Sequence, residues 1–160
     1  MPTHLQGNHA AIATSRATLA DLDALAGLFD AYRVFYRQPS DRRAARAFLQ
    51  ERLQRGESVI FIAQAAASGA ALGFTQLYPS FSSVSARRTW ILNDLFVAPE
   101  ARQRGGARAL MACAQSFAMT TGALRLALET AKDNRAAQAL YESLGYVREA
   151  GFRHYALEPA

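Results

Sequence analysis

The chain has 160 residues, of which 51% are hydrophobic, and a formal net charge of +5. This length suits one domain with a sizeable core, and a charged fraction of 19% argues against long disorder. No apolar run reaches the length of a membrane span, and the first ten residues lack the apolar region of a signal peptide. We expect a flexible lead-in over residues 1–10 and a single domain over residues 11–160, with no membrane partner.

The polar and reactive residues narrow the function classes further. A lone cysteine, Cys113, excludes an internal disulfide and favours the cytoplasm. The three histidines are scattered at positions 4, 9 and 154, so we expect no metal. The basic charge fits an anionic small molecule or a nucleic acid, but the arginines are spread over the chain rather than gathered in a stripe. We therefore do not expect a nucleic-acid partner.

The first half of the chain predicts two helices and four strands. Alternating side chains predict a strand at Ile12–Arg16, and helical spacing predicts a first helix from Leu22 to Tyr32. A second predicted helix is capped by Ser40, carries Leu53 on its apolar side and ends at Gly56. Residues 58–65 and 71–78 predict a hairpin around a Ser-Gly turn. Residues 79–86 are predicted as a loop, and residues 88–97 as the next strand.

The second half of the chain alternates between predicted helices and strands. It predicts a helix over residues 108–121, a short strand over 124–128, a helix over 134–144 and a last strand over 146–157. The order βααβββαβαβ predicts an α/β fold, in which the hairpin gives antiparallel neighbours and the strand–helix–strand step a parallel pair. An exposed strand edge in the region of residues 146–157 would allow a homodimer.

The most informative segment is Arg102-Gln103-Arg104-Gly105-Gly106-Ala107, which joins a strand to a helix. Glycines let a backbone bend and approach a ligand, and the first amides of a helix lack partners inside it. Together they suit a phosphate, to which the two arginines add charge. Neither the G-x-G-x-x-G dinucleotide pattern nor the Gly-Lys-Ser/Thr of a P-loop is present. The segment predicts a site for a phosphorylated ligand; an ordinary bend is the alternative.

A second group of residues follows on a later helix. Asn134 and Tyr141 are two helical turns apart and so share one face. Asparagine can donate and accept hydrogen bonds at once, and a tyrosine hydroxyl can supply a proton. Packing of Tyr141 in the core is the alternative interpretation.

The two segments together resemble the GNAT N-acetyltransferases. Arg102-x-x-Gly105-x-Ala107, after Leu95-Phe96-Val97-x-Pro99-Glu100, is similar to the family's acetyl-CoA pyrophosphate motif, and Asn134-x-x-Ala137-x-x-x-Tyr141-x-x-x-Gly145-Tyr146 resembles its second motif. Leu77-Tyr78-Pro79 and Asn93-Asp94-Leu95 are similar to the group related to yeast histone and D-amino-acid acetyltransferases. The resemblance implies a GNAT-like, mixed, mostly antiparallel sheet, with a parallel central pair splayed around the cofactor and about four flanking helices.

The resemblance also implies roles for individual residues, with acetyl-CoA as co-substrate and no metal. Backbone groups of Phe96 and Val97 would pair with the pantetheine arm, and an N–H near Leu95 or Phe96, at a bulge, would polarise the thioester carbonyl. Asn134 would bind the pantetheine or position Tyr141, which would protonate the leaving thiolate. The implied cofactor-binding residues are Leu95, Phe96, Val97, Arg102, Gln103, Arg104, Gly105, Gly106, Ala107, Arg108, Asn134, Ala137 and Tyr141.

Two carboxylates compete for the role of general base. Asp94 precedes the thioester strand segment and is slightly favoured, whereas Glu129 ends the next strand, where some family members carry an acidic base. Alternatively, Asp94 holds a neighbouring loop, Glu129 caps the following helix, and neither acts. In this family the acceptor walls come from the first helices and the loop before the third strand, which here carry Tyr32, Arg33, Phe35, Tyr36, Arg37, Tyr78, Phe81 and Ser82. These aromatics and arginines indicate an acceptor with a carboxylate or an apolar body.

Three functions follow in order of support. The first is an acetyl-CoA-dependent N-acetyltransferase that acts on a primary amine of a small molecule or peptide, by direct attack in a ternary complex. The alternative is a non-catalytic CoA-binding sensor or scaffold, which would need neither Tyr141 nor a base. A nucleic-acid binder rests on charge alone and ranks last.

Overall fold

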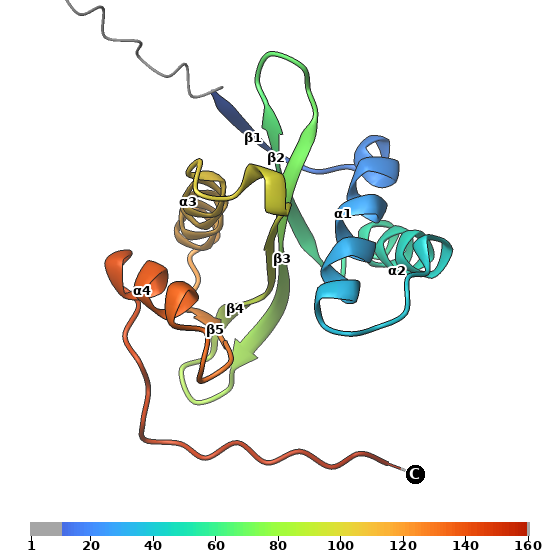
Figure 1. The fold of residues 1–160 in the computed structure, drawn as a ribbon. Helices are drawn as coiled ribbons and strands as arrows, with labels where there is room; N and C mark the ends of the chain where they lie inside the picture. The colour runs from blue at the N-terminus through green and yellow to red at the C-terminus, as the bar shows by residue number, and fades with distance from the viewer. Residues whose placement is uncertain (1–10, 160) are drawn as a thin grey trace, which may run out of the picture. The chain divides into compact units, whose positions relative to one another are not determined.

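The computed structural model describes residues 11–159, so the predicted lead-in over residues 1–10 lies outside the described residues. The chain divides into two compact units, the first ending at Glu129 and the second beginning at Thr130. The prediction of one domain over residues 11–160 stays a prediction. The first unit contains β1 (Ile12–Arg16), η1 (Leu19–Asp21), α1 (Leu22–Phe35), α2 (Arg42–Gln54), β2 (Val59–Ala65), β3 (Ala71–Ser82), β4 (Arg87–Val97), η2 (Pro99–Ala101), α3 (Gly106–Thr120) and β5 (Leu126–Leu128) (Figure 1).

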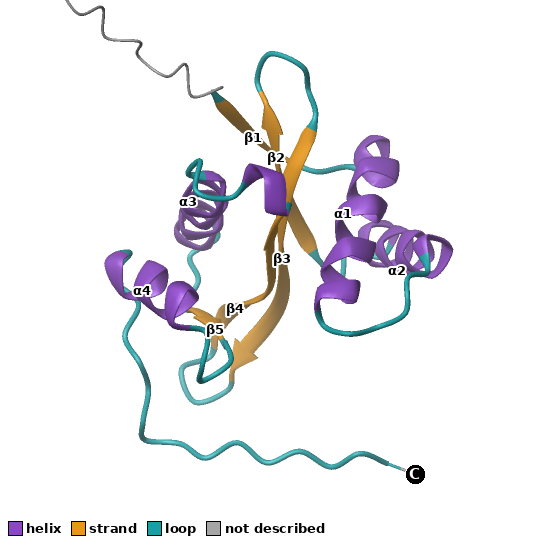
Figure 2. Cartoon of the chain, viewed as in Figure 1, coloured by secondary structure: helices purple, strands orange, loops and turns teal. Residues whose placement is uncertain are grey.

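One five-stranded sheet forms the centre of this unit. Its strands lie in the order β1-β2-β3-β4-β5, antiparallel except for the parallel β4–β5 pair (Figure 2). The predicted fold class, a mixed and mostly antiparallel α/β fold, is confirmed. The parallel pair was expected at the centre of the sheet, but it lies at one end, because β5 is the last strand among the described residues.

Helices cover both faces of the sheet. Helices α1 and α2 pack on one face and α3 packs on the other (Figure 1). On the first face, Phe74 of β3 meets the rings of Phe29 and Tyr32 from α1. On the second face, Phe61 and Trp90 pack against Phe117 of α3. Burial of this apolar surface is the main stabilising contribution to the unit.

The hairpin from β3 to β4 is longer than the sequence predicts. Residues 79–82 were predicted as loop but continue β3, where Ser80 pairs with Thr89 and Phe81 with Arg88. Proline removes a donor from the ladder and is tolerated where no bond is lost. By the alternation of the strand, Pro79 directs its nitrogen toward the β2 side, and β2 ends its pairing at Leu77.

The second unit contains α4 (Arg135–Ser143). The strand predicted over residues 146–157 is not observed, since residues 146–159 form no helix or strand. This segment exposes its large apolar side chains, which are Val147, Phe152, Tyr155 and Leu157. A strand needs a partner for its backbone groups, and a sequence pattern cannot supply one. Among the described residues, no helix is long and apolar enough to cross a membrane.

Candidate functional site

Strand β4 contains a β-bulge at Asn93. Gln76 of β3 pairs with Asp94, and the next residue, Leu77, pairs with Leu92. Asn93 is therefore the extra residue of the longer strand. A bulge in this strand was predicted near the thioester, and the structure places it two residues before Leu95.

The bulge reverses the faces that the β4 side chains occupy. Trp90, before the bulge, packs on Phe117 of α3. Phe96 is an even number of residues further on, yet its ring lies 6.1 Å from that of Tyr32 in α1. Because side chains alternate along a strand, only an inserted residue brings about this exchange. Asp94 shares the α1 face with Phe96.

Strands β4 and β5 separate beyond the bulge. Their parallel pairing covers residues 90–92 of β4, after which β5 ends at Leu128 while β4 continues to Val97. Residues 93–97 of β4 therefore have β3 on one side and no strand on the other, among the described residues. We call this segment the open edge. Unpaired backbone groups of this kind can bind an extended ligand.

Alternation decides which backbone groups face the open edge. The N–H of Ala98 donates to the carbonyl of Leu72, 2.8 Å away on the β3 side. Phe96, two residues earlier, directs its backbone groups the same way, whereas Leu95 and Val97 direct theirs to the open edge. Of the two residues predicted to pair with the pantetheine arm, Val97 faces the open edge and Phe96 faces β3.

The turn between β4 and α3 has the backbone that a phosphate site requires. Gln103 and Gly105 both adopt left-handed conformations, with φ of 61° and 85°. The first bond of α3 runs from the N–H of Ala109 to the carbonyl of Gly105. The amides of Gly106 and Ala107 precede that bond and have no acceptor within the helix. They lie at the positive end of the helix dipole, as the sequence predicts for a phosphate ligand.

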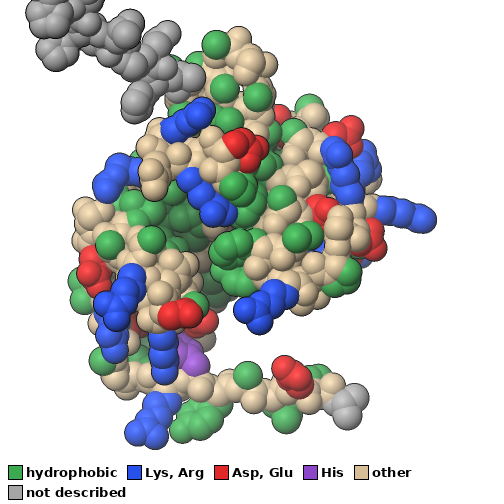
Figure 3. All heavy atoms as spheres, viewed as in Figure 1, with side chains coloured by type: hydrophobic (Ala, Val, Ile, Leu, Met, Phe, Trp, Pro, Cys, Tyr) green, Lys and Arg blue, Asp and Glu red, His purple; other side chains and the backbone are tan. Residues whose placement is uncertain are grey.

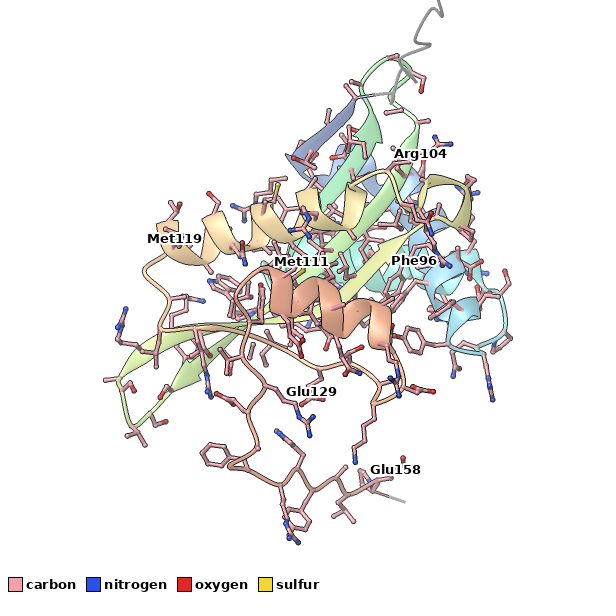
Figure 4. The ribbon with its side chains drawn as sticks, turned by 60° about the vertical axis from the view of Figure 1, so that its left-hand side comes forward. Phe96, Arg104, Met111, Met119, Glu129 and Glu158 are labelled. Carbon is pink, nitrogen blue, oxygen red and sulfur yellow. The ribbon has the colours of Figure 1, made fainter. Side chains whose placement is uncertain are left out.

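The arginines of this turn differ in their contacts. Arg102 donates through Nε to the carbonyl of Val97, at 3.1 Å, and its guanidinium lies 5.6 Å from the centre of the Phe35 ring. It therefore fastens the turn to the end of β4. Arg104 and Arg108 are exposed beside the start of α3, where Figure 4 shows Arg104.

Asp94 is the centre of a buried polar network. Only 3% of it is exposed, and its carboxylate accepts hydrogen bonds from Gln76 Nε2, at 2.8 Å, and Asn93 Nδ2, at 3.1 Å. A hydrogen bond also joins it to the Tyr32 hydroxyl. The Asp94 carbonyl accepts from Thr75 Oγ1. These bonds fix the carboxylate beside the bulge, on the face of α1.

Aromatic side chains surround this carboxylate. Burial and then the Asp94 charge raise the pKa of the Tyr32 hydroxyl, and the same two causes raise the pKa of Tyr78 to about 12. Both hydroxyls therefore stay protonated at neutral pH. Phe35 and Tyr36, at the end of α1, are 57% and 56% exposed. Hydrophobic side chains line a hollow that Figure 3 shows between α3 and α1.

Other predicted acceptor residues lie in different surroundings. Arg33 faces Asp30, at 3.8 Å between Nη1 and Oδ1. Phe81 lies under the guanidinium of Arg88, near the tip of the β3–β4 hairpin. Neither is part of the Asp94 network. The sequence did not single out Gln76, although an amide within the apolar run of β3 is a signal that could have identified it.

Glu129 lies at the level of the bulge. Leu128 of β5 pairs with Leu92, so Glu129 follows at the point where the two strands separate. Its side chain is exposed, and Figure 4 shows it far from Arg104. The two candidate bases thus differ in environment, since Asp94 is buried in hydrogen bonds and Glu129 is open to solvent.

In the second unit, Asn134 begins α4. Its Oδ1 accepts from the N–H of Ala137 at 3.2 Å, so it fills the N-cap position that one alternative gave to Glu129. The ring of Tyr141 lies 6.1 Å from that of Tyr146. Gly145, at φ of 87°, ends the helix as predicted. Among residues 11–159, no group of three or more His, Cys, Asp or Glu side chains could hold a metal ion.

Known proteins share this architecture. The model of the acetyltransferase (GNAT) family matches residues 25–146. An uncharacterized N-acetyltransferase of Bacillus subtilis (strain 168), YhfO, is 51% identical over 89% of this chain and 94% of its own length.

Solved structures agree with that match. A crystal structure of a probable acetyltransferase superposes with a TM-score of 0.88 at 46% identity, covering 92% of this chain and 98% of the other. AAC(6')-Iy, solved in complex with the bisubstrate analog CoA-S-monomethyl-acetylneamine, gives a TM-score of 0.75 at 26% identity over 93% of this chain and 99% of its own. The chain therefore belongs to the acetyltransferase (GNAT) family.

Proposed function

We propose that this protein transfers the acetyl group of acetyl-CoA to a primary amine, by direct attack in a ternary complex. One observation carries the proposal: the open edge of β4 begins at a bulge and leads directly into a left-handed turn at the start of α3. A strand edge suits the amides of a pantetheine arm, and a helix start suits a pyrophosphate. The same strand thus offers sites for both parts of one donor.

Several residues of the chain are suited to contacts with acetyl-CoA. Leu95 and Val97 present backbone groups to the open edge, and the amides of Gly106 and Ala107 present donors to a phosphate. When bound, acetyl-CoA supplies the acetyl group as an activated thioester. We assign the Leu95 N–H, next to the bulge, to the developing charge on the carbonyl oxygen. A preorganised amide at such a position is worth about 3 kcal/mol.

A general base must prepare the amine. An alkylammonium has a pKa of roughly 10.4, so only about one molecule in a few thousand is neutral at pH 7. A carboxylate can take the proton directly or through a water molecule. We propose Asp94, because it lies at the bulge on the face that the aromatic residues of α1 line. Glu129, exposed at the same level of the sheet, is the alternative.

The leaving thiolate needs an acid. We assign Tyr141 as the acid that protonates the departing thiolate, on the resemblance of its motif. A thiol has a pKa of roughly 8.5, so it needs only modest help to leave. Asn134 orders the first turn of the same helix as its N-cap. Ala137, whose N–H donates to Asn134 Oδ1, remains a predicted contact of acetyl-CoA.

The test is an acceptor screen with acetyl-CoA that follows release of free thiol. The panel contains amino acids, polyamines, aminoglycosides and a basic peptide; AAC(6')-Iy, whose structure holds an acetylneamine analog, makes aminoglycosides a natural inclusion. We expect acceptor-dependent thiol release with at least one amine. Acetyl-CoA binding without release on any acceptor would instead support a CoA-binding sensor. A cytoplasmic location and a homodimer remain predictions.

A further inference from the structure

The buried Asp94 carboxylate forms no ion pair with any of the described residues. Its hydrogen-bond partners are Gln76, Asn93 and Tyr32, all of them neutral. A buried carboxylate without a counterion is costly, even where neutral donors surround it. The network therefore favours a positively charged group that residues 11–159 do not provide.

Gln76 adds a second acceptor on the same face. Its side chain is fully buried, and its Oε1 has no hydrogen-bond partner among the described residues. The amide cannot be turned to correct this, because the Asp94 carboxylate accepts only and requires Nε2 to face it. Leaving a buried carbonyl oxygen unpaired costs stability. Oε1 thus lacks the donor that a buried carbonyl oxygen requires.

The neighbouring groups do not meet this need. The Tyr78 phenol also interacts with the Gln76 side chain, yet Gln76 Oε1 has no hydrogen-bond partner among the described residues. Arg52, which also acts on Tyr78, is held by Glu51 at 2.9 Å and Glu57 at 2.6 Å. The cation on this side of the network is therefore already paired.

An ammonium group with several N–H donors matches these requirements. It would neutralise the carboxylate and satisfy the amide oxygen, while the rings of Tyr32 and Tyr78 suit a cation on an apolar chain. The ammonium loses one proton to a carboxylate, which becomes a carboxylic acid, and the primary amine keeps two N–H bonds. An N–H bond to Gln76 Oε1 would hold the neutral nitrogen in place while its lone pair turns to the thioester.

We propose that Asp94 and Gln76 form a subsite that accepts hydrogen bonds from a primary ammonium group at two points. Gln76 thereby selects substrates whose amine carries N–H bonds. The proposal rests on the proposed function and adds a residue that selects its acceptor. Gln76 is a specificity-determining residue here, whereas the base remains a carboxylate.

The test compares two cations of equal charge, n-butylammonium and n-butyltrimethylammonium, which has no N–H. Each is titrated into the 15N-labelled full chain without acetyl-CoA, and binding is followed on the side-chain amide signal that Gln76→Met removes. We expect n-butylammonium to bind about tenfold more tightly, as for a hydrogen bond to a charged group. Gln76→Met should lose this preference. Ser58→Ala, which removes another buried hydrogen-bonding group with no partner, should keep it.

The outcomes separate this proposal from the proposed function. Equal affinity of the wild type for the two cations would overturn the subsite, whether or not Gln76→Met folds. Retention of the preference in a folded Gln76→Met variant would overturn the role of Gln76. Selective binding of n-butylammonium without acetyl transfer to any amine of the panel would leave the subsite standing and refute the proposed acetyl transfer. Acetyl transfer to n-butylamine by a folded Gln76→Met variant, with a KM equal to that of the wild type, would leave the enzyme activity standing and overturn the subsite.

Discussion

A substitution at Gly73 tests whether the proposed acetyl-CoA site depends on the close approach of β3 to β4. Gly73 faces Val97 across the two strands. A Cβ at this position would lie 2.5 Å from the Phe96 carbonyl oxygen, 3.1 Å from Val97 Cα and 3.2 Å from Val97 Cγ2. The first two contacts are with backbone, so no side-chain rotation relieves them. In a Gly73→Ala variant the strands must separate at the open edge.

The expected effect follows from this clash. Overpacking of a close contact costs about 1–3 kcal/mol, and we expect the free energy of unfolding to fall by that amount. The displacement also moves the backbone of Leu95 and Val97 and the bond from Arg102 to Val97. Because a small misplacement weakens a preorganised site strongly, acetyl-CoA should bind about tenfold more weakly or worse.

The assay uses the single tryptophan of the chain, Trp90, which is buried against Phe117. Urea unfolding followed by its fluorescence gives stability, and calorimetric titration gives the affinity for acetyl-CoA. Gly27→Ala is the matched control, because its Cβ would meet only the flexible Arg42 guanidinium, at 3.7 Å. In a helix this change should gain up to about 1 kcal/mol. A Gly73→Ala variant as stable as the wild type, with unchanged acetyl-CoA affinity, would refute the reasoning.

Three further predictions concern proton transfer and pH. Tyr141→Phe should slow acetyl transfer by about 10²-fold and leave acetyl-CoA affinity unchanged, and an unchanged turnover number would remove Tyr141 from the mechanism. Asp94→Asn should shift the pH–rate profile for kcat/KM. The same profile is measured for Glu129→Gln, and a shift in that variant alone would make Glu129 the base. The raised pKa values of Tyr32 and Tyr78 mean that the folded chain holds protons that the unfolded chain loses above pH about 10. Their contribution to stability is therefore complete below that pH and is lost as pH rises through about 12, the folded-state pKa of Tyr78. Urea unfolding across this range checks it, and stability that rises there would contradict the assignment.

The sequence predicted the family and enzyme class because both rest on local signals. Gly105 is read within one short segment, and the capping Asn134, Tyr141 two turns later and Gly145 within another. The left-handed conformations of Gly105 and Gly145 are what such glycines permit. Gln103, which adopts the same conformation without being glycine, gave no comparable signal.

The remaining features depend on pairing between distant segments. Gln76 meets Asp94 only because Asn93 is inserted into β4, and a bulge cannot be located from one strand alone. Residues 79–82, the first half of the loop predicted over residues 79–86, became strand for the same reason, since residues 87–90 supply their partners. Conversely, residues 146–157 carry a strand-like pattern and form no strand, because no partner pairs with them in the described chain.

The central claim is that this chain moves an acetyl group from acetyl-CoA to a primary amine. Its most direct test is mass spectrometry of the acceptors after incubation with acetyl-CoA and the wild-type protein, with free thiol counted in the same samples. We predict an acetylated amine in an amount equal to the thiol released, and neither product from acetyl-CoA in the absence of an acceptor. Saturable binding of acetyl-CoA with no acetylated product across the panel would contradict the claim and favour a non-catalytic CoA-binding protein.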